Sequence, residues 1–133
     1  RSDAAQGDRN LTNPNNYRSI RFADVLLMAA EAFNRSATPN DAKAQGYLNR
    51  VRQRAFGDMM HNITATGATL TENIFQERRV ELAGEGHRFF DLVRTGKAAQ
   101  EIDGFVAGKH EVFPIPVIEI QLTGNRWSQN PGY

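Results

Sequence analysis

The sequence predicts a mainly α-helical protein, with helical hairpins of the tetratricopeptide type and a long irregular C-terminal tail. Three observations predict this fold class. Apolar side chains recur at helical spacing over about 17–35 and again over about 39–56. Only a few residues separate these stretches, so the two helices should pack antiparallel, in a span close to one tetratricopeptide unit. In the last third of the chain, prolines, glycines and asparagines interrupt the apolar residues and do not continue helices.

The first predicted helix follows a polar stretch, residues 1–16, which has no periodicity and is expected to be a loop lead-in. On the helix surface, Arg21 and Asp24 are spaced to form an ion pair, and so are Glu31 and Arg35. The apolar residues recur at i, i+3, i+4, i+7 and i+11, which predicts a buried stripe. This stripe consists of Phe22, Val25, Leu26, Ala29 and Phe33.

The second predicted helix begins with residues that favour a helix start. Thr38 is a suitable N-cap, and Pro39 suits the first helical position because an N–H there would have no partner in the helix. Gly57 can end the helix in the left-handed conformation, and residues 58–68 should then form a loop. The predicted buried stripe of this helix consists of Ala44, Leu48, Val51 and Ala55.

A third helix is predicted from a capping box. Thr69 and Glu72 are spaced so that each side chain can bond the backbone N–H of the other. The helix should run to about Ala83, where Gly84 and Gly86 interrupt or bend the chain.

A fourth helix is expected over 87–96, and residues 97–102 add a short helical segment. Gly96 provides the stop between them. One apolar face of the fourth helix consists of Phe89, Leu92 and Val93.

The tail contains Val-Phe-Pro-Ile-Pro, which cannot lie in a central strand because proline lacks the N–H that a sheet needs. This segment should be extended, and Pro116 should begin a helical turn. Partial burial is expected for Val112, Phe113 and Ile115.

The composition excludes several functional classes. A chain of 133 residues suits one domain, predicted here at 17–133. The 16 basic residues are nearly balanced by 15 acidic ones, which gives no electrostatic argument for a nucleic-acid partner or an anionic membrane surface. The absence of cysteine excludes disulfides, a thiol nucleophile and cysteine metal sites. Because the chain opens without methionine or a signal peptide, we expect it to be an internal or processed part of a longer protein.

The densest group of charged side chains lies at 77–94, among bulky apolar residues. We interpret it as a structural ion-pair cluster, because charges placed among core residues must be satisfied. Residues three or four positions apart can pair on one helix face, as Glu81 with Arg78 or Asp91 with Arg94. Such networks fix how helices cross more than they add stability. The cluster consists of Glu77, Arg78, Glu81, Glu85, His87, Arg88, Asp91 and Arg94.

A catalytic interpretation of this cluster stays open but is disfavoured. Glu77 and Glu81 lie one helical turn apart, and a carboxylate pair can act on a glycosidic bond. In glycosidases, however, the two carboxylates flank a cleft of about 5–10 Å. Neighbouring arginines also favour the ionised form over the protonated form that a general acid needs. Phosphate-loop and serine-nucleophile motifs are absent from the sequence.

A metal site is also disfavoured, and no cofactor is predicted. His87 and Asp91 are at i, i+4 and could share an ion, but His61 and His110 lie in separate segments without ligand spacing. An intrahelical hydrogen bond between His87 and Asp91 is the simpler expectation.

Two further features have ordinary explanations. The arginines at 50–54 suit an exposed or ion-paired helix surface better than a nucleic-acid patch. The amphipathic aromatic residues are scattered, so core or rim packing is favoured over a sugar platform, and the ligand-binding residues stay unknown. These aromatic residues are Tyr17, Tyr47, Trp127 and Tyr133.

Five stretches together resemble the C-terminal region of SusD/RagB-family proteins. In chain order they are RFADVLLMAAEAFN, LNRVRQRA, IFQERRVELAGEGHRFFDLVRTG, VFPIPVIEIQL and QNPGY. The resemblance covers nearly the whole chain from Tyr17 to Tyr133. Gly84 and Thr95 stand where the family commonly has large aromatic residues, and Trp127 stands where it usually has an aliphatic one. These departures imply altered local packing.

The resemblance implies a function that the residues alone do not. Members of this family are outer-membrane lipoproteins of Bacteroidetes, exposed at the cell surface, with largely helical, tetratricopeptide-like scaffolds. They bind starch, other polysaccharides or other nutrients and pair with a TonB-dependent SusC-like transporter, and they are not enzymes. Their lipid anchor lies outside the segment matched here. The resemblance implies that this segment is mostly scaffold; a helical-repeat protein-interaction module and a glycoside hydrolase remain the alternatives.

Overall fold

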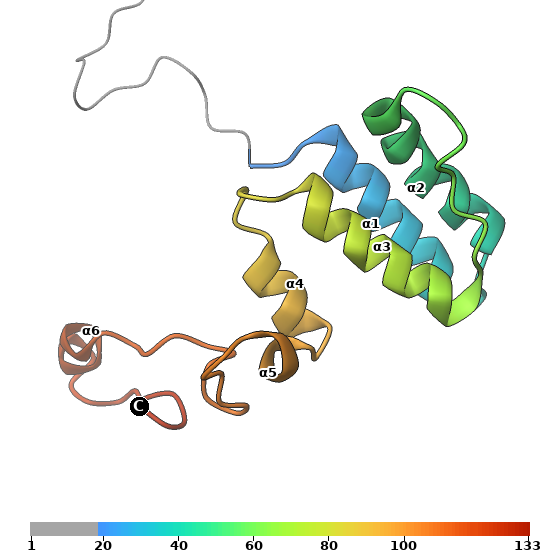
Figure 1. Cartoon of the computed structure of the whole chain (residues 1–133). Helices are drawn as coiled ribbons and strands as arrows, with labels where there is room; N and C mark the ends of the chain where they lie inside the picture. Colours follow the sequence, from blue (N-terminus) through green and yellow to red (C-terminus); the bar gives the residue numbers. More distant parts are fainter. Residues whose placement is uncertain (1–18) are drawn as a thin grey trace, which may run out of the picture. The chain divides into compact units, whose positions relative to one another are not determined.

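The structure, a computed structural model, describes residues 19–133, so the expected lead-in at 1–16 lies outside the described residues. As predicted, the fold is mainly helical, and residues 19–133 contain no strand (Figure 1). The described chain falls into two compact units, with the boundary between Glu85 and Gly86. The first unit contains α1 (Phe22–Arg35), α2 (Asp41–Phe56) and α3 (Gly67–Glu81). The second contains α4 (Arg88–Arg94), α5 (Ala98–Glu101) and α6 (Val117–Leu122).

In the first unit, α1 runs antiparallel to both α2 and α3 (Figure 1). Hydrogen bonds at the helix ends fix these directions. Arg21, just before α1, binds Glu81 at the end of α3, whereas Asn34 near the end of α1 binds the Gly67 carbonyl at the start of α3. The α1–α2 pair is therefore the predicted antiparallel hairpin. The core shared by the three helices consists of Leu26, Leu27, Ala30, Ala44, Leu48, Val51, Leu70 and Ile74.

The predicted stripe of α1 was placed partly on the wrong face, and the helix begins at Phe22 instead of 17. Phe22 and Val25 are exposed, whereas Leu27 and Ala30 are fully buried. The helix carries apolar residues on both sides, so spacing alone could not identify the side that meets α2 and α3.

The ends of α2 were predicted in part. Gly57 adopts the left-handed conformation with φ of 78° and ends the helix as expected. The N-cap is Asn40 instead of Thr38, because the Asn40 side chain accepts a hydrogen bond of 3.0 Å from the Lys43 N–H. Ala44, Leu48 and Val51 are buried as predicted, but Ala55 lies exposed in the last turn.

The segment between α2 and α3 returns along α2, so that both helices start at the same end. Three α2 amides, one helical turn apart, bind it. Asn49 donates to the Ile63 carbonyl at 2.9 Å and accepts from the Ile63 N–H at 2.8 Å. Gln45 donates to the Ala65 carbonyl, and Gln53 donates to the Asn62 side chain. These side chains provide hydrogen-bond partners for backbone groups of the segment that have none in a sheet or helix.

The predicted capping box at Thr69 is wrong, because α3 starts two residues earlier, at Gly67. A residue of α2 provides an acceptor for the first N–H of α3: Asp41 accepts a hydrogen bond of 2.7 Å from the Gly67 N–H. Asn34 donates to the other Asp41 oxygen at 2.9 Å. Tertiary contacts therefore replace the local cap that the sequence suggested.

The second unit has short helices joined by turns. The helical segment expected at 97–102 forms α5, and Pro116 precedes α6 as predicted. The 113–116 segment is extended, with Ile115 half-buried. Burial was overestimated for Val112 and Phe113, which are exposed. Gln129 clamps Ile115 by accepting from its N–H at 2.7 Å and donating to its carbonyl at 2.8 Å.

Candidate functional site

The eight residues predicted as one charged cluster divide between the two units. Glu77, Arg78, Glu81 and Glu85 belong to the first unit, and the other four belong to the second. In the first unit, the main ion-pair partners lie on α2 or at the start of α1, outside the predicted set. The local sequence identified the carboxylates and Arg78 but not the arginines that bind those carboxylates.

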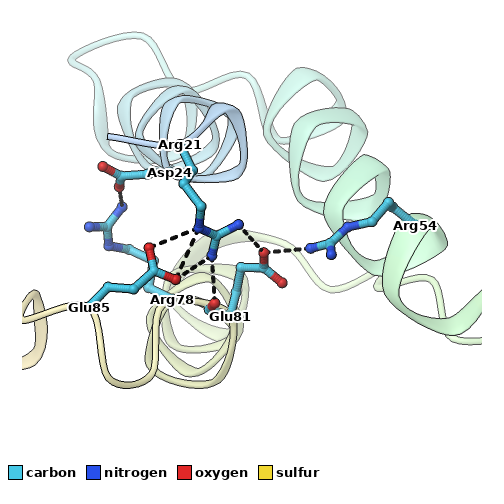
Figure 2. Close-up of polar contacts among 6 residues, drawn as sticks. All are labelled: Arg21, Asp24, Arg54, Arg78, Glu81 and Glu85. Carbon is cyan, nitrogen blue, oxygen red and sulfur yellow. Dashed lines mark hydrogen bonds and ion pairs between the residues drawn. The ribbon is translucent and has the colours of Figure 1, made fainter. Parts of the chain in front are cut away.

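Arg21 joins the start of α1 to the end of α3 (Figure 2). Its guanidinium donates to Glu81 Oε1 at 2.9 Å, to the Glu81 carbonyl at 2.8 Å and to Glu85 Oε1 at 2.6 Å. These charge-assisted contacts, first with Glu85 and then with Glu81, hold the pKa of Arg21 above its usual range. Glu81 also accepts from Arg54 of α2 at 2.5 Å, so the carboxylate connects all three helices.

Arg78 and Asp24 form the most buried ion pair of the first unit. Arg78 Nη1 lies 2.7 Å from Asp24 Oδ1, and the two side chains are only 6% and 5% exposed. The predicted pairing of Asp24 with Arg21 does not form, because Arg21 binds the carboxylates of Glu81 and Glu85 instead. In contrast, the predicted pair of Glu31 and Arg35 is present at 2.5 Å.

Glu77 is held by α2. Its carboxylate accepts from Arg52 Nη1 at 2.5 Å, and Arg52 Nε donates to the His61 carbonyl. Glu77 and Glu81 are each about nine-tenths buried and bind different arginines. Both carboxylates therefore form ion pairs that link α3 to other segments of the first unit.

The second-unit members of the cluster are more exposed. Asp91 Oδ1 accepts from Arg94 Nη2 at 2.7 Å, as the spacing predicted. The hydrogen bond between His87 and Asp91 is a backbone one, in which the Asp91 N–H donates to the His87 carbonyl at 3.0 Å. Arg88 pairs with Glu101 at 3.1 Å instead of Asp91, with both side chains about two-fifths exposed. Exposed pairs of this kind contribute about 0–1 kcal/mol.

The second unit also contains an open, mostly apolar pocket of about 360 Å³. Three phenylalanines line it, and the ring centroid of Phe89 lies 6.5 Å from that of Phe105 and 6.2 Å from that of Phe113. His110 Nδ1 accepts from the Val106 N–H, which leaves Nε2 to carry the proton in the neutral ring. The aromatic faces could stack against a flat apolar group. The lining consists of Phe89, Ile102, Asp103, Gly104, Phe105, His110, Val112, Phe113 and Tyr133.

The amphipathic aromatic residues within 19–133 are distributed over the two units. Tyr47 stacks on Phe33 in the first unit, and Tyr133 lines the pocket of the second. Trp127 is exposed, and Tyr17 lies outside the described residues.

Residues 19–133 contain neither a group of metal-ligating side chains nor a membrane-spanning helix. No group of three or more histidine, aspartate or glutamate side chains in that range is arranged to hold a metal ion. Among the same residues, no helix has both the length and the apolarity to cross a membrane.

Comparison with known proteins decides the family. The model of the SusD family matches residues 2–112. The chain belongs to the SusD family. A SusD-like protein, P2, of Formosa agariphila is 32% identical over 142 aligned positions, which cover 96% of this chain. A SusD-like protein of Bacteroides ovatus is 34% identical over 86 residues, or 64% of this chain.

A solved structure has the same fold. It is the crystal structure of a SusD homolog from Bacteroides thetaiotaomicron, with a TM-score of 0.74, 35% sequence identity and 85% of this chain covered. The chain spans only part of these relatives: 28% of the Formosa P2 protein and 25% of the crystallised one. The family resemblance inferred from the sequence motifs is confirmed.

Proposed function

We propose that this chain is the C-terminal part of a cell-surface glycan- or nutrient-binding lipoprotein. The whole protein would capture a glycan or other nutrient oligomer and deliver it to a TonB-dependent SusC-like outer-membrane transporter, without catalysis. Its lipid anchor would lie outside this segment, and the segment itself would act mostly as scaffold. The observation that carries this proposal is membership of the SusD family, from a match over residues 2–112.

The ion-pair geometry supports a scaffold role for the charged cluster. A glycosidase needs one carboxyl group that carries a proton and a cleft between its two carboxylates. Glu77 and Glu81 instead accept from Arg52 and from Arg21 and Arg54, and neither lines the aromatic pocket. Removing Glu77 is therefore expected to lower the melting temperature more than the ligand affinity, whereas removing Arg88, whose ion pair is exposed, should change either only slightly.

The experiment is calorimetric titration of the full-length protein with a panel of polysaccharides, with an assay for reducing ends in each mixture. Binding without release of reducing ends is the expected result. Cleavage that Glu77→Gln and Glu81→Gln abolish would establish the hydrolase. If the protein bound no glycan of the panel but bound a peptide or protein, the result would favour the helical-repeat interaction module.

A further inference from the structure

The aromatic pocket of the second unit is built from three segments that are separate in the sequence. Phe89 comes from α4, Phe105 from the turn after α5, and Phe113 from the extended segment before α6. The Phe89 ring plane is tilted by 53° from that of Phe105 and by 34° from that of Phe113. The rings therefore present differently oriented surfaces to one volume of about 360 Å³. Small-molecule sites typically measure about 300–1,000 Å³.

Hydrogen bonds from the last residues of the chain hold one wall of this pocket. The Tyr133 hydroxyl donates to the Val112 carbonyl at 3.1 Å, and the Asn130 amide donates to the Phe113 carbonyl at 2.6 Å. Tyr133, Val112 and Phe113 all line the pocket. Contacts within the protein therefore shape this wall, and a preformed wall lowers the entropic cost of binding a ligand.

The lining side chains offer few hydrogen-bonding groups to a ligand. The Tyr133 hydroxyl already donates to Val112, and His110 Nδ1 already accepts from the Val106 N–H. The groups that remain are the Asp103 carboxylate, His110 Nε2 and the Tyr133 oxygen as an acceptor. A sugar bound here would turn several hydroxyl groups toward phenylalanine rings, and a polar group that loses water without gaining a hydrogen bond costs free energy. The lining therefore suits a ligand that needs few hydrogen bonds.

The charge of the lining favours a cation. Asp103 is exposed, and no basic side chain within residues 19–133 forms an ion pair with it. The face of an aromatic ring carries a partial negative charge that attracts cations. The protein shows this attraction next to the pocket, where Lys109 Nζ lies 4.7 Å from the centroid of the Tyr133 ring. A free carboxylate beside several aromatic rings disfavours an anion and leaves a neutral ligand with less to gain than a cation.

We propose that this pocket binds a small organic cation of the quaternary ammonium class, with the trimethylammonium group of choline as the model. The methyl groups would contact the rings of Phe89, Phe105 and Phe113, and the Asp103 carboxylate would balance the charge. Because a quaternary ammonium has no N–H, it needs no hydrogen bond from the lining, which fits the shortage of polar groups. This site and this ligand class go beyond the proposed glycan capture and do not depend on it.

The test compares choline with its neutral carbon isostere, in which a tert-butyl group replaces the trimethylammonium group. Each is titrated against the full-length protein, and binding is followed by saturation transfer to the methyl protons of the ligand in NMR spectra. We expect choline to bind at least roughly tenfold more tightly than the isostere. Equal binding of the two, no binding of choline, or a methyl glucoside that displaces choline at lower concentration than choline itself would overturn the proposal.

Two variants with exposed side chains place the cation in this pocket without threatening the fold. Phe113→Leu keeps apolar bulk but removes a ring, and Asp103→Asn keeps the shape but removes the charge. Each should weaken choline binding by roughly two- to fivefold and leave the neutral isostere unchanged. Trp127→Leu and Glu119→Gln are the matched controls, because both residues are exposed in the second unit and lie outside the lining. Unchanged choline affinity in both pocket variants would mean that the cation binds elsewhere, and the proposal would fail.

Free choline and the phosphocholine head group of a lipid share this chemistry, and vesicle flotation separates the two sources. The full-length protein is mixed with phosphatidylcholine vesicles or, as the control, with phosphatidylglycerol vesicles. More flotation with phosphatidylcholine, by a margin that Phe113→Leu removes, would assign the lipid head group; choline binding with equal flotation would assign a soluble cation. No readout here uses polysaccharide binding, so failure of this inference is distinguishable from failure of the proposed function.

Discussion

The two units use charge and apolar surface differently. In the first, three helices enclose a continuous core, and Asp24 and Arg78 pair inside it. In the second, the helices are short, and the buried apolar side chains are those of Leu92 and Ala98. Arg88 and Glu101 form their pair near the surface. Arg78 and Arg88 are only 10 positions apart in sequence, but their ion pairs are expected to contribute differently to stability.

The difference teaches that burial, rather than the density of charged residues, decides what an ion pair contributes. A buried pair that loses one partner leaves a charge without water or counter-ion. An exposed pair that loses one partner leaves a charge that water solvates.

The largest effect is expected from Arg78→Ala. It leaves the Asp24 carboxyl group without its arginine partner in a site that is 5% exposed, at a cost of about 3–5 kcal/mol in the free energy of unfolding. Arg88→Ala is the matched variant in the second unit and should cost about 0–1 kcal/mol. Urea unfolding of the two variants measures both values, and similar losses would contradict the role assigned to burial.

Leu48→Ala should have a slightly smaller effect. Leu48 is fully buried in the first unit, so the lost contacts and the cavity should cost about 2–5 kcal/mol. Phe113→Ala removes a larger side chain that is 72% exposed and should change stability by about 0.5 kcal/mol or less. Thermal unfolding of both variants checks this order; a reversal would mean that the second unit depends more on apolar packing than its burial indicates.

Sequence periodicity identified the buried residues well for a helix with apolar residues along one face only. The stripe of α2 is an example: Ala44, Leu48 and Val51 are buried as its spacing required. It failed on α1, where apolar residues on both sides left the buried face undetermined. Periodicity describes one helix at a time, and the choice of face depends on the neighbours.

The sequence indicated which kinds of residue form the charged cluster but not which residues pair with one another. The carboxylates at 77, 81 and 85 were identified as paired, but Arg21 and Arg52 were not recognised as their partners. These contacts join residues 25–64 positions apart in sequence, and helical spacing carries no information at that range. The arginines at 50–54 were the one indication of these partners in the sequence, because they were expected to form either an exposed or an ion-paired helix surface.

In each unit, a side-chain amide forms hydrogen bonds with both the N–H and the carbonyl of a single residue. Asn49 clamps the N–H and carbonyl of Ile63, and Gln129 clamps those of Ile115. Asn49→Ala removes two hydrogen bonds, and Gln129→Ala removes three, because Gln129 also accepts from the Asn130 N–H; each variant should cost about 1–3 kcal/mol. Amide hydrogen exchange should speed at Ile63 in the first variant and at Ile115 in the second. Faster exchange throughout both units in either variant would contradict a local role.

The smallest effect concerns pH. Hydrogen bonds from the Gly67 N–H and then from Asn34 hold the pKa of Asp41 below its usual range. Its stabilising contribution is therefore fully present above the ordinary aspartate value of about 3.9 and is lost as the pH falls through the lowered value. The melting temperature of Asp41→Asn should lie below that of the wild type at neutral pH, and the gap should close in acid. A gap that widens in acid would contradict the assignment.

The most direct test of the account is to measure melting temperature and glycan affinity together for the full-length protein carrying Glu81→Gln, beside Glu119→Gln as an exposed control. Glu81 binds Arg21 and Arg54, so its replacement should lower the melting temperature while affinity stays within about twofold of the wild type. The control should change neither. A loss of affinity or of glycan cleavage with an unchanged melting temperature would show that this carboxylate serves the ligand and not the fold.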